Sequence, residues 1–401
     1  MDISHNRYKF HILSVLLVPA IITPLLAACI VNGGIPDMAW NRTYDGDYYD
    51  YGSFVQQTGD GGYIITGGVS PVYKGDRNVL LIKTDSEGNP EWQKSFGGDS
   101  FDYGYFVQCI DDVGYIIAGT TDSYGNGSGD VFLVRTDADG NMQWNRTYGG
   151  DRMDEGISLV QSGDGGYIVA GFTESFGNRG RDIYLVRTDV AGNTMWERTY
   201  GTSRNESAIS IQPATDGGYI ISGYAEDEDG KAKACLMKID DRGDVRWEKQ
   251  YDSPYDSYAY SVQQTGDGGF VVSGYTYIRP GISDMLLIRT DADGNVMWTK
   301  SIGDNTGRKG YMAYPTDDGG YIAIGIINYN PSGAYDGYLA HIDPNGDLLW
   351  EKVFGGDKDE FIRTGIITND GSLVVTGSIG EANDVETWDV YLAKFNASTA
   401  R

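Results

Sequence analysis

Acidic side chains recur at one position of this sequence, just before a short β-patterned run, at intervals of about 52 residues. Carboxylate oxygens are the ligands that calcium prefers in proteins. If the fold gathers these runs around one channel, the acids are candidates for holding a cation. The alternatives are that they cap turns or pair with basic residues of the repeat. The position is filled by Asp50, Asp102, Asp154, Glu206 and Glu360, and by Ser257 and Arg308 in two other repeats.

Histidine and cysteine chemistry has few residues to use. Of 3 His, two lie in the N-terminal segment, and His341 occupies a position that is otherwise basic in every repeat. His341 is best explained as a substitution at a repeat position that is normally Lys or Arg, rather than as a metal ligand or a catalytic residue. This interpretation disfavours a Ser-His-Asp triad, a Cys-His pair and a His-ligated zinc. The basic position comprises Lys83, Arg135, Arg187, Lys238, Arg289, His341 and Lys394.

Two turn sequences resemble ligand loops only superficially. The Asp-x-Asp-Gly-Asn segments at 137–141 and 291–295 lack the third carboxylate and the distant bidentate Glu of an EF-type calcium loop. The Gly-rich segment 125–129 has no helix after it to hold a phosphate. We therefore expect hairpin turns here and no cofactor, with calcium the only ion left as a candidate.

Aromatic and arginine side chains gather in the segments that vary most between repeats. Tyr and Arg often anchor recognition surfaces, and aromatic rings stack on sugars, so these residues are candidates for a ligand-binding face. The alternative is that the rings fold back onto their own loops. The aromatic candidates are Tyr73, Tyr124, Phe176, Tyr277 and Tyr329, and the basic ones are Arg152, Arg179, Arg181, Arg204, Arg279 and Arg308.

Seven tryptophans reveal the elements that must position these side chains. Trp40, Trp92, Trp144, Trp196, Trp247, Trp298 and Trp350 are spaced 52, 52, 52, 51, 51 and 52 residues apart. A repeat of that length is typical of a propeller or a solenoid. In the third repeat, the runs 155–161, 167–172, 182–188 and 194–200, here called a, b, c and d, are short and rich in β-branched and aromatic residues. They indicate four β-strands.

The turns between the runs predict how the ring closes. Asp-Gly or related signals of tight hairpins separate runs a and b in seven repeats, but runs c and d in only six. The last repeat ends after its c run, 389–395, whereas an extra d run, 38–44, stands near the N-terminus. We predict an all-β, seven-bladed propeller of four-stranded antiparallel blades, closed by the N-terminal strand. An open solenoid is the alternative.

The repeat resembles a known family of propeller sequences. The segment 290–298, with its Asp, Gly and Trp in that order, is similar to the tryptophan-docking repeat of pyrroloquinoline-quinone-type propellers. The whole unit resembles tandem repeats of prokaryotic surface proteins, over residues 38–395. The resemblance implies the fold and not an activity. No quinone pocket can be matched, so it implies no cofactor.

The repeated aromatic residues are expected to pack the blades together. Trp of each d run should be a wedge between sheets, and the Tyr that opens most b runs should have the same role. Basic residues two positions after each Trp should lie on the outer strand and discourage edge-to-edge pairing. Cys109 and Cys235 fall in different repeats, so we expect separate buried thiols.

The N-terminal sequence indicates an export signal. A short basic patch is followed by an apolar stretch from 10 to 28 and by Cys29 in a Leu-Ala-Ala-Cys sequence, which resembles the lipobox of prokaryotic lipoproteins. We expect residues 1–28 to be a signal peptide, Cys29 to carry the lipid, 29–37 to be a tether and 38–397 to form the propeller. The alternative is an uncleaved membrane anchor.

Charge and residue content narrow the function. A net charge of -26 argues against nucleic-acid binding, which needs clustered cations. We therefore expect a lipid-anchored, extracytoplasmic binding or scaffold module at the cell surface, with a protein or glycan ligand. The alternative is a carboxylate-dependent polysaccharide hydrolase or lyase. For that alternative, the acidic segment 226–229 in the fourth repeat is the nearest group of acids that is unique to one blade.

Overall fold

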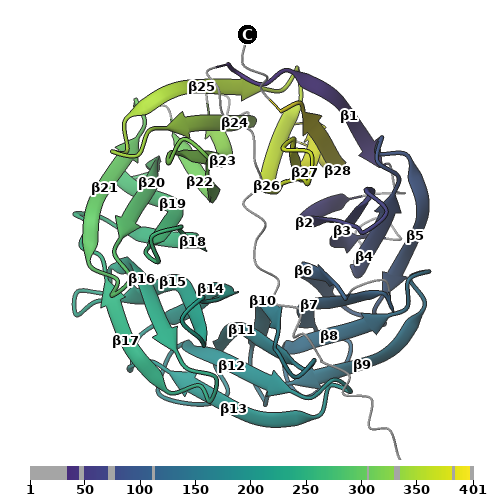
Figure 1. Cartoon of the computed structure of the whole chain (residues 1–401). Coiled ribbons are helices and arrows are strands. Elements are labelled where there is room, and N and C mark those ends of the chain that lie inside the picture. Colours follow the sequence, from purple (N-terminus) through teal and green to yellow (C-terminus); the bar gives the residue numbers. More distant parts are fainter. Residues whose placement is uncertain are drawn as a thin grey trace, which may run out of the picture.

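The structure, a computed structural model, describes residues 34–44, 49–70, 77–110, 113–304, 307–328, 335–381 and 384–397. Within these residues, 28 β-strands form seven four-stranded antiparallel sheets, and no α-helix is present. The sheets are arranged as the blades of a ring (Figure 1). The predicted seven-bladed propeller is therefore confirmed. Among the described residues there is also no helix of the length and hydropathy needed to cross a membrane.

Each of the first six blades is a meander of strands a to d. Blade 1 contains β2 (Asp50–Gln57), β3 (Tyr63–Val69), β4 (Asn78–Thr84) and β5 (Pro90–Phe96). Blade 2 contains β6 (Asp102–Cys109), β7 (Tyr115–Thr121), β8 (Asp130–Thr136) and β9 (Met142–Tyr148). Blade 3 contains β10 (Asp154–Gln161), β11 (Tyr167–Thr173), β12 (Asp182–Thr188) and β13 (Thr194–Tyr200).

The next three blades repeat the pattern. Blade 4 contains β14 (Glu206–Pro213), β15 (Tyr219–Glu226), β16 (Ala232–Ile239) and β17 (Val245–Gln250). Blade 5 contains β18 (Ser257–Gln264), β19 (Phe270–Arg279), β20 (Ile282–Thr290) and β21 (Val296–Ile302). Blade 6 contains β22 (Arg308–Pro315), β23 (Tyr321–Asn328), β24 (Tyr335–Ile342) and β25 (Leu348–Phe354).

Blade 7 joins the two ends of the chain. It consists of β26 (Asp359–Ile367), β27 (Leu373–Glu381), β28 (Asp384–Phe395) and the N-terminal β1 (Met38–Tyr44). β1 pairs antiparallel with β28, from Met38 against Phe395 to Tyr44 against Val390. The pairing of 38–44 with 389–395 predicted from the turn count is thereby confirmed, and the open solenoid is wrong.

The hydrophobic core is divided among the interfaces between blades. One cluster joins Ile116 and Leu133 of blade 2 to Leu159 and Val186 of blade 3, and the other clusters are built in the same way. Trp144 packs at this interface with its ring centroid 6.3 Å from that of Tyr167, the first residue of strand b in blade 3. The predicted wedge role of the tryptophans is confirmed, since equivalent pairs join Trp40 to Tyr63, Trp92 to Tyr115, Trp247 to Phe270 and Trp298 to Tyr321.

Candidate ligand-binding site at the axis of the ring

The innermost strand of every blade carries a β-bulge at the same place. In β2, for example, Gly52 pairs with Gly67 and Phe54 pairs with Thr66, which leaves Ser53 without an opposite residue. A bulge re-aims a side chain, and bulges are over-represented next to functional sites. Because the a strands surround the axis in Figure 1, the bulge residues form a ring there. They are Ser53, Tyr105, Ile157, Ile209, Tyr260, Tyr311 and Arg363.

Arg363 shows that side chains from several blades converge at the axis. Its guanidinium carbon lies 5.2 Å from the ring centroid of Tyr51 in blade 1 and 5.3 Å from that of Phe361 in its own blade. Burial raises the pKa values of Tyr105, Tyr260 and Tyr311, three tyrosines from blades 2, 5 and 6, and in each case the charge of Arg363 opposes the rise. Arg363 itself is exposed. One cation thus lies within electrostatic reach of four other blades.

Aromatic rings form a continuous wall on one side of the axis, from blade 4 to blade 7. The chain of contacts runs from Tyr224 to Tyr258 and Tyr275, each step 5.1 Å between centroids, and from Tyr275 to Tyr260 at 5.6 Å. It continues from Tyr260 to Tyr311 at 5.2 Å and on to Phe361 at 6.2 Å. Most of these rings are only half-buried. Such a surface suits stacking on sugar rings or burial of apolar peptide side chains.

Two cations, Lys309 on this wall and Arg77 beside blade 1, stack on aromatic rings and form no ion pair with a carboxylate of the described residues. Lys309 Nζ lies 4.8 Å above the ring of Tyr275, and Arg77 lies 4.3 Å from the ring of Tyr49. Burial lowers the pKa of Lys309. A ligand group with negative charge would therefore find positive partners that are not already neutralised.

Blade 3 contributes a carboxyl group, Glu155, to the lining. Glu155 stands two residues before the bulge of β10, the position held by Tyr103 in blade 2 and Lys309 in blade 6. Burial raises the pKa of Glu155 to about 7, and the nearby Arg181 only partly opposes the shift. Arg181 is held by Glu174 through an Nε to Oε1 distance of 2.9 Å.

The aromatic candidates from the variable loops lie in different places. Tyr277 belongs to the axial wall, with its ring 5.7 Å from Tyr275. Tyr124 and Phe176 are exposed but held by neighbouring groups: the Tyr124 hydroxyl donates to Gly97 O, in the loop between blades 1 and 2, at 2.6 Å, and Phe176 packs on Tyr184 of its own blade at 5.9 Å. Tyr73 and Tyr329, like the lipidation candidate Cys29, lie outside the described residues.

Among the arginine candidates, Arg152, Arg179 and Arg279 are exposed, Arg204 is half-buried, and none of these four stacks on an aromatic ring of the described residues. The expectation that Arg308 is exposed is wrong. Only 4% of Arg308 is accessible, because its guanidinium is enclosed beside Asp304 and Glu351, at 3.5 and 3.3 Å. Arg181 is half-buried, stacks 4.3 Å from Phe172 and pairs with Glu174.

The recurring acids do not meet at the mouth of a channel. Four of them, Asp50, Asp102, Asp154 and Glu206, are the first residues of their strands rather than preceding them, and Glu360 is the second residue of β26. All five are at most 4% exposed. Asp102 Oδ2 accepts hydrogen bonds from Gly98 N at 2.9 Å and Ser123 Oγ at 2.7 Å, so it ties the d–a loop to the b–c loop. Turn capping, one of the alternatives, therefore describes Asp102. No group of three or more His, Cys, Asp or Glu in the described part of the chain is arranged to hold a metal.

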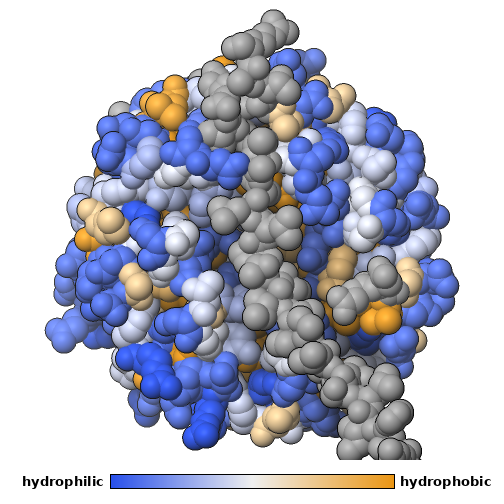
Figure 2. Space-filling view, in the orientation of Figure 1, coloured by the Kyte–Doolittle hydropathy of each residue, from blue (hydrophilic) through white to orange (hydrophobic). Residues whose placement is uncertain are grey.

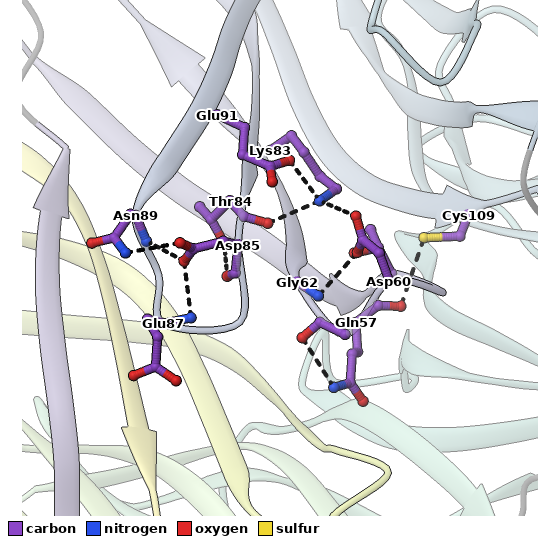
Figure 3. Close-up of polar contacts among 12 residues, drawn as sticks. Gln57, Asp60, Gly62, Lys83, Thr84, Asp85, Glu87, Asn89, Glu91 and Cys109 are labelled. Atoms are coloured by element: carbon purple, nitrogen blue, oxygen red, sulfur yellow. Dashed lines mark hydrogen bonds and ion pairs between the residues drawn. The ribbon is translucent and has the colours of Figure 1, made fainter.

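The other alternative, pairing of these acids with the basic residues of strand c, is wrong. Six of the seven side chains at this position instead reach the Asp of the a–b turn in their own blade, as Lys83 does with Asp60 at 2.8 Å (Figure 3). The same pair joins Arg187 to Asp164, Lys238 to Asp216, Arg289 to Asp267 and Lys394 to Asp370. His341 follows the pattern, with Nε2 3.3 Å from Asp318 Oδ2. This places His341 in a structural ladder, as expected from its repeat position. The seventh, Arg135, donates to the backbone oxygens of Tyr115 and Val113, at 3.1 and 3.4 Å.

The remaining chemical candidates are accounted for by local structure. Glu226 accepts a hydrogen bond from Asn205 Nδ2 at 2.9 Å, and Asp227 pairs with Lys233 at 3.4 Å, so the acidic segment 226–229 closes a hairpin. Cys109 and Cys235 are both free, and burial raises their pKa values. The face seen in Figure 2 is largely hydrophilic, with hydrophobic residues in small separate areas.

Sequence reasoning missed the axial site because its key residues are defined by strand register. The positions two before the bulge are chemically diverse, which is the one signal that could have been used: Tyr51, Tyr103, Glu155, Ser207, Tyr258, Lys309 and Phe361. At structural positions of the repeat, by contrast, the residue type is nearly constant. Variation at an inward position therefore separates ligand-facing residues from packing residues.

Comparisons with known proteins support the fold and say less about function. No protein-family model matches the chain. The chain is 25% identical over 365 residues to the regulatory protein FlaEY of Caulobacter vibrioides. The aligned region covers 81% of this chain but only 35% of that protein. The chain therefore spans about a third of this curated relative's length.

Solved structures of similar shape share little sequence identity with this chain. The WD40 domain of Pan2 from Neurospora crassa superposes with a TM-score of 0.53 at 10% identity, covering 90% of this chain and 99% of that domain. Sqt1 from Chaetomium thermophilum gives 0.52 at 11% identity, covering 91% of this chain and 100% of that one. Puromycin hydrolase gives 0.53 at 14% identity, covering 90% and 55%. Identities this low show the fold alone.

Proposed function

We propose that this chain is a non-catalytic binding module, a lipid-anchored extracytoplasmic propeller that holds a protein or glycan ligand at the axis of its ring. The observation that carries the proposal is the lining itself, an aromatic wall interrupted by Arg363 and Lys309. Packing inside a blade does not require these residues, because other blades place Ile209 or Ser53 at the bulge. Aromatic and arginine side chains of this kind usually dominate the energy of recognition.

The cations of the lining favour a ligand with acidic groups. The protein as a whole is strongly acidic, and a field of that sign repels anions. Arg363, Lys309 and Arg77 keep positive charge at the axis in spite of it, without carboxylate partners among the described residues. A glycan that contains uronic acids or an acidic peptide would satisfy both the rings and the cations.

A test of binding compares an axial residue with an exposed residue off the axis. The full chain, in detergent, is screened on a glycan array and in a pull-down from cell-surface extract, and each hit is titrated against Arg363→Gln and Tyr124→Ala. We expect Arg363→Gln to weaken binding at least about tenfold and Tyr124→Ala to leave it within about twofold. Equal effects of the two variants, or loss only with Tyr124→Ala, would contradict an axial site.

The membrane anchor needs its own test because Cys29 is outside the described residues. Cys29→Ser should remove the thiol that receives the lipid, so the protein should move from the membrane fraction to the soluble exported fraction and lose incorporation of labelled fatty acid. Retention of label in the Cys29→Ser variant would contradict lipidation at this residue.

A polysaccharide hydrolase or lyase is the second candidate, and Glu155 is the observation that favours it. A carboxyl at the axis with a pKa of about 7 suits a general acid or base, and Asp122 and Glu174 are close enough to raise that pKa further. Release of reducing or unsaturated sugar ends by the wild type, abolished in Glu155→Gln with binding retained, would establish catalysis. Binding without any turnover would support the module proposed above.

A further inference from the structure

Two junctions between neighbouring blades bring a pair of buried carboxylates together over a glycine. At the first, an ideal Cβ built on Gly201 would lie 2.3 Å from Asp182 Oδ1 and 2.9 Å from Glu206 Oε2. At the second, a Cβ on Gly355 would lie 2.2 Å from Asp336 Oδ1 and 2.5 Å from Glu360 Oε2. The space of the missing side chain is thus lined by two acidic oxygens from different blades.

One oxygen of each pair has no hydrogen-bond donor. Glu206 and Glu360 are 4% and 3% exposed, and their Oε2 atoms are buried without a partner. The other oxygen of Glu206, Oε1, accepts from Thr202 N at 3.2 Å and Thr202 Oγ1 at 2.6 Å, which fixes the carboxylate. A buried carboxylate oxygen left bare beside a second carboxylate is costly unless a positive charge neutralises it.

We propose that these two junctions each bind a divalent, oxygen-seeking cation, Ca²⁺, which bridges the acid at the start of one strand c to the acid at the start of the next strand a. Asp182 and Glu206 form the first site, and Asp336 and Glu360 the second. Backbone carbonyls of the loops and water complete the oxygen shell, as is usual for Ca²⁺. The bound ion clamps blade 3 to blade 4 and blade 6 to blade 7.

Three other junctions differ from these two. Between blades 1 and 2 the strand c position is Asn78, so the pair has one charge. Between blades 2 and 3 the oxygen of Asp154 that faces Asp130 across Gly149 is already engaged, because Oδ2 accepts from Gly150 N and Ser175 Oγ at 2.8 and 2.7 Å. Between blades 5 and 6 the first residue of strand a is the cation Arg308, so this junction has no second acid there.

Asn78 also supplies a substitution that the fold already tolerates. Asp182→Asn and Asp336→Asn would reproduce at each site the amide and carboxylate combination of the first junction, where Asn78 Oδ1 and Asp102 Oδ2 approach Gly97. The double variant should therefore fold but lose cation binding. Asp102→Asn is the control, since it changes a buried acid at the start of a strand a that belongs to neither site.

The experiment measures thermal unfolding of the full chain in detergent at pH 7.5, with EDTA or with Ca²⁺ up to 5 mM. Sites with two carboxylates bind weakly, with dissociation constants on the order of 10⁻⁴ to 10⁻³ M, so millimolar Ca²⁺ is needed. We expect the midpoint to rise by about 3 °C or more in the wild type and in Asp102→Asn, and not in the double variant.

Two outcomes would overturn the proposal. The first is no shift with Ca²⁺, and the second is an equal shift in the double variant. If the double variant does not fold, Tb³⁺ decides on the wild type: two Tb³⁺ ions per chain, excited through tyrosine and displaced by Ca²⁺, support the sites, and no sensitised luminescence rejects them.

Discussion

The charge state of Glu155 follows from its position in the axial lining. Tyrosines occupy the equivalent positions in three other blades, at Tyr51, Tyr103 and Tyr258, and Glu155 itself is half-buried. A carboxyl in such a place prefers its neutral form, because burial penalises the charge. This is why the pKa of Glu155 rises to about 7, although Arg181 lies near it.

This shift predicts a pH dependence of stability that Glu155→Gln should remove. Glu155 holds its proton in the folded protein up to a pH of about 7 but loses it near 4.5 in the unfolded chain. Between these values the folded state binds more protons, so its stability falls as pH rises, and above 7 the loss is complete. Relative to Glu155→Gln, the wild type should therefore lose stability from pH 5 to pH 7 and change no further at pH 8.

Urea unfolding at each pH measures this difference. Glu228→Gln, which changes an exposed carboxylate, should run parallel to the wild type. A wild type whose stability relative to Glu155→Gln rises between pH 5 and pH 7 would show that Arg181 outweighs burial.

At the level of strands and turns, six of the seven outer strands pack their Trp against a glycine in a turn of the next blade. The Trp144 ring covers the turn at Gly192, where an added Cβ would lie 2.9 Å from the ring and where φ is +78°. The last residue of the same strand, Tyr148, donates its hydroxyl hydrogen to Gly192 O at 2.6 Å. Tyr44, Tyr200 and Tyr251 make the same bond to Gly88, Gly243 and Gly294. The basic residue two after Trp also lies here, since Arg146 stacks 5.4 Å from Trp144.

Blade 1 lacks this hydroxyl, which makes a pair of opposite substitutions informative. Tyr148→Phe removes the bond and leaves Gly192 O without its donor, so we expect a loss of about 1 kcal/mol in the free energy of unfolding. Phe96→Tyr places a hydroxyl where Trp92 already covers the turn at Gly140, and should be neutral or stabilising by up to about 1 kcal/mol. Guanidinium unfolding midpoints of both variants measure these values. An unchanged midpoint for Tyr148→Phe would mean that the bond contributes nothing.

Features of the fold that depend on residue spacing could be predicted from the sequence. Features that depend on strand register or on neighbours across the ring could not. Tryptophan spacing and turn signals were sufficient for the blades, because tight hairpins and wedge residues are local. The bulge that presents Tyr260 and Arg363 has no local signature, since it is defined by pairing with strand b. Tyr124 and Arg308 looked available for binding in the sequence, but Gly97 O holds the first, and Asp304 and Glu351 enclose the second.

At the scale of the whole molecule, β1 determines whether the ring is closed. It supplies the outer strand of blade 7 and also the contact with blade 1, because Trp40 packs 6.0 Å from Tyr63 and the Tyr44 hydroxyl donates to Gly88 O at 2.8 Å. Without β1, strand β28 would present an unpaired edge and the interface between blades 7 and 1 would lose its outer part. Burial of Trp40 and the strand hydrogen bonds together should contribute on the order of 5 kcal/mol.

Two truncations test this closure. A chain that begins at residue 36 keeps β1, and one that begins at residue 49 lacks it. We expect the shorter chain to unfold at a clearly lower temperature and over a broader range, because opened rings lose cooperativity between their end blades. A synthetic peptide of residues 36–45 should pair with the free edge of β28 and restore much of the midpoint of the longer chain. Equal midpoints for the two truncations would mean that the ring is stable without its N-terminal strand. If the peptide does not bind, the stabilisation comes from chain connectivity rather than from strand pairing.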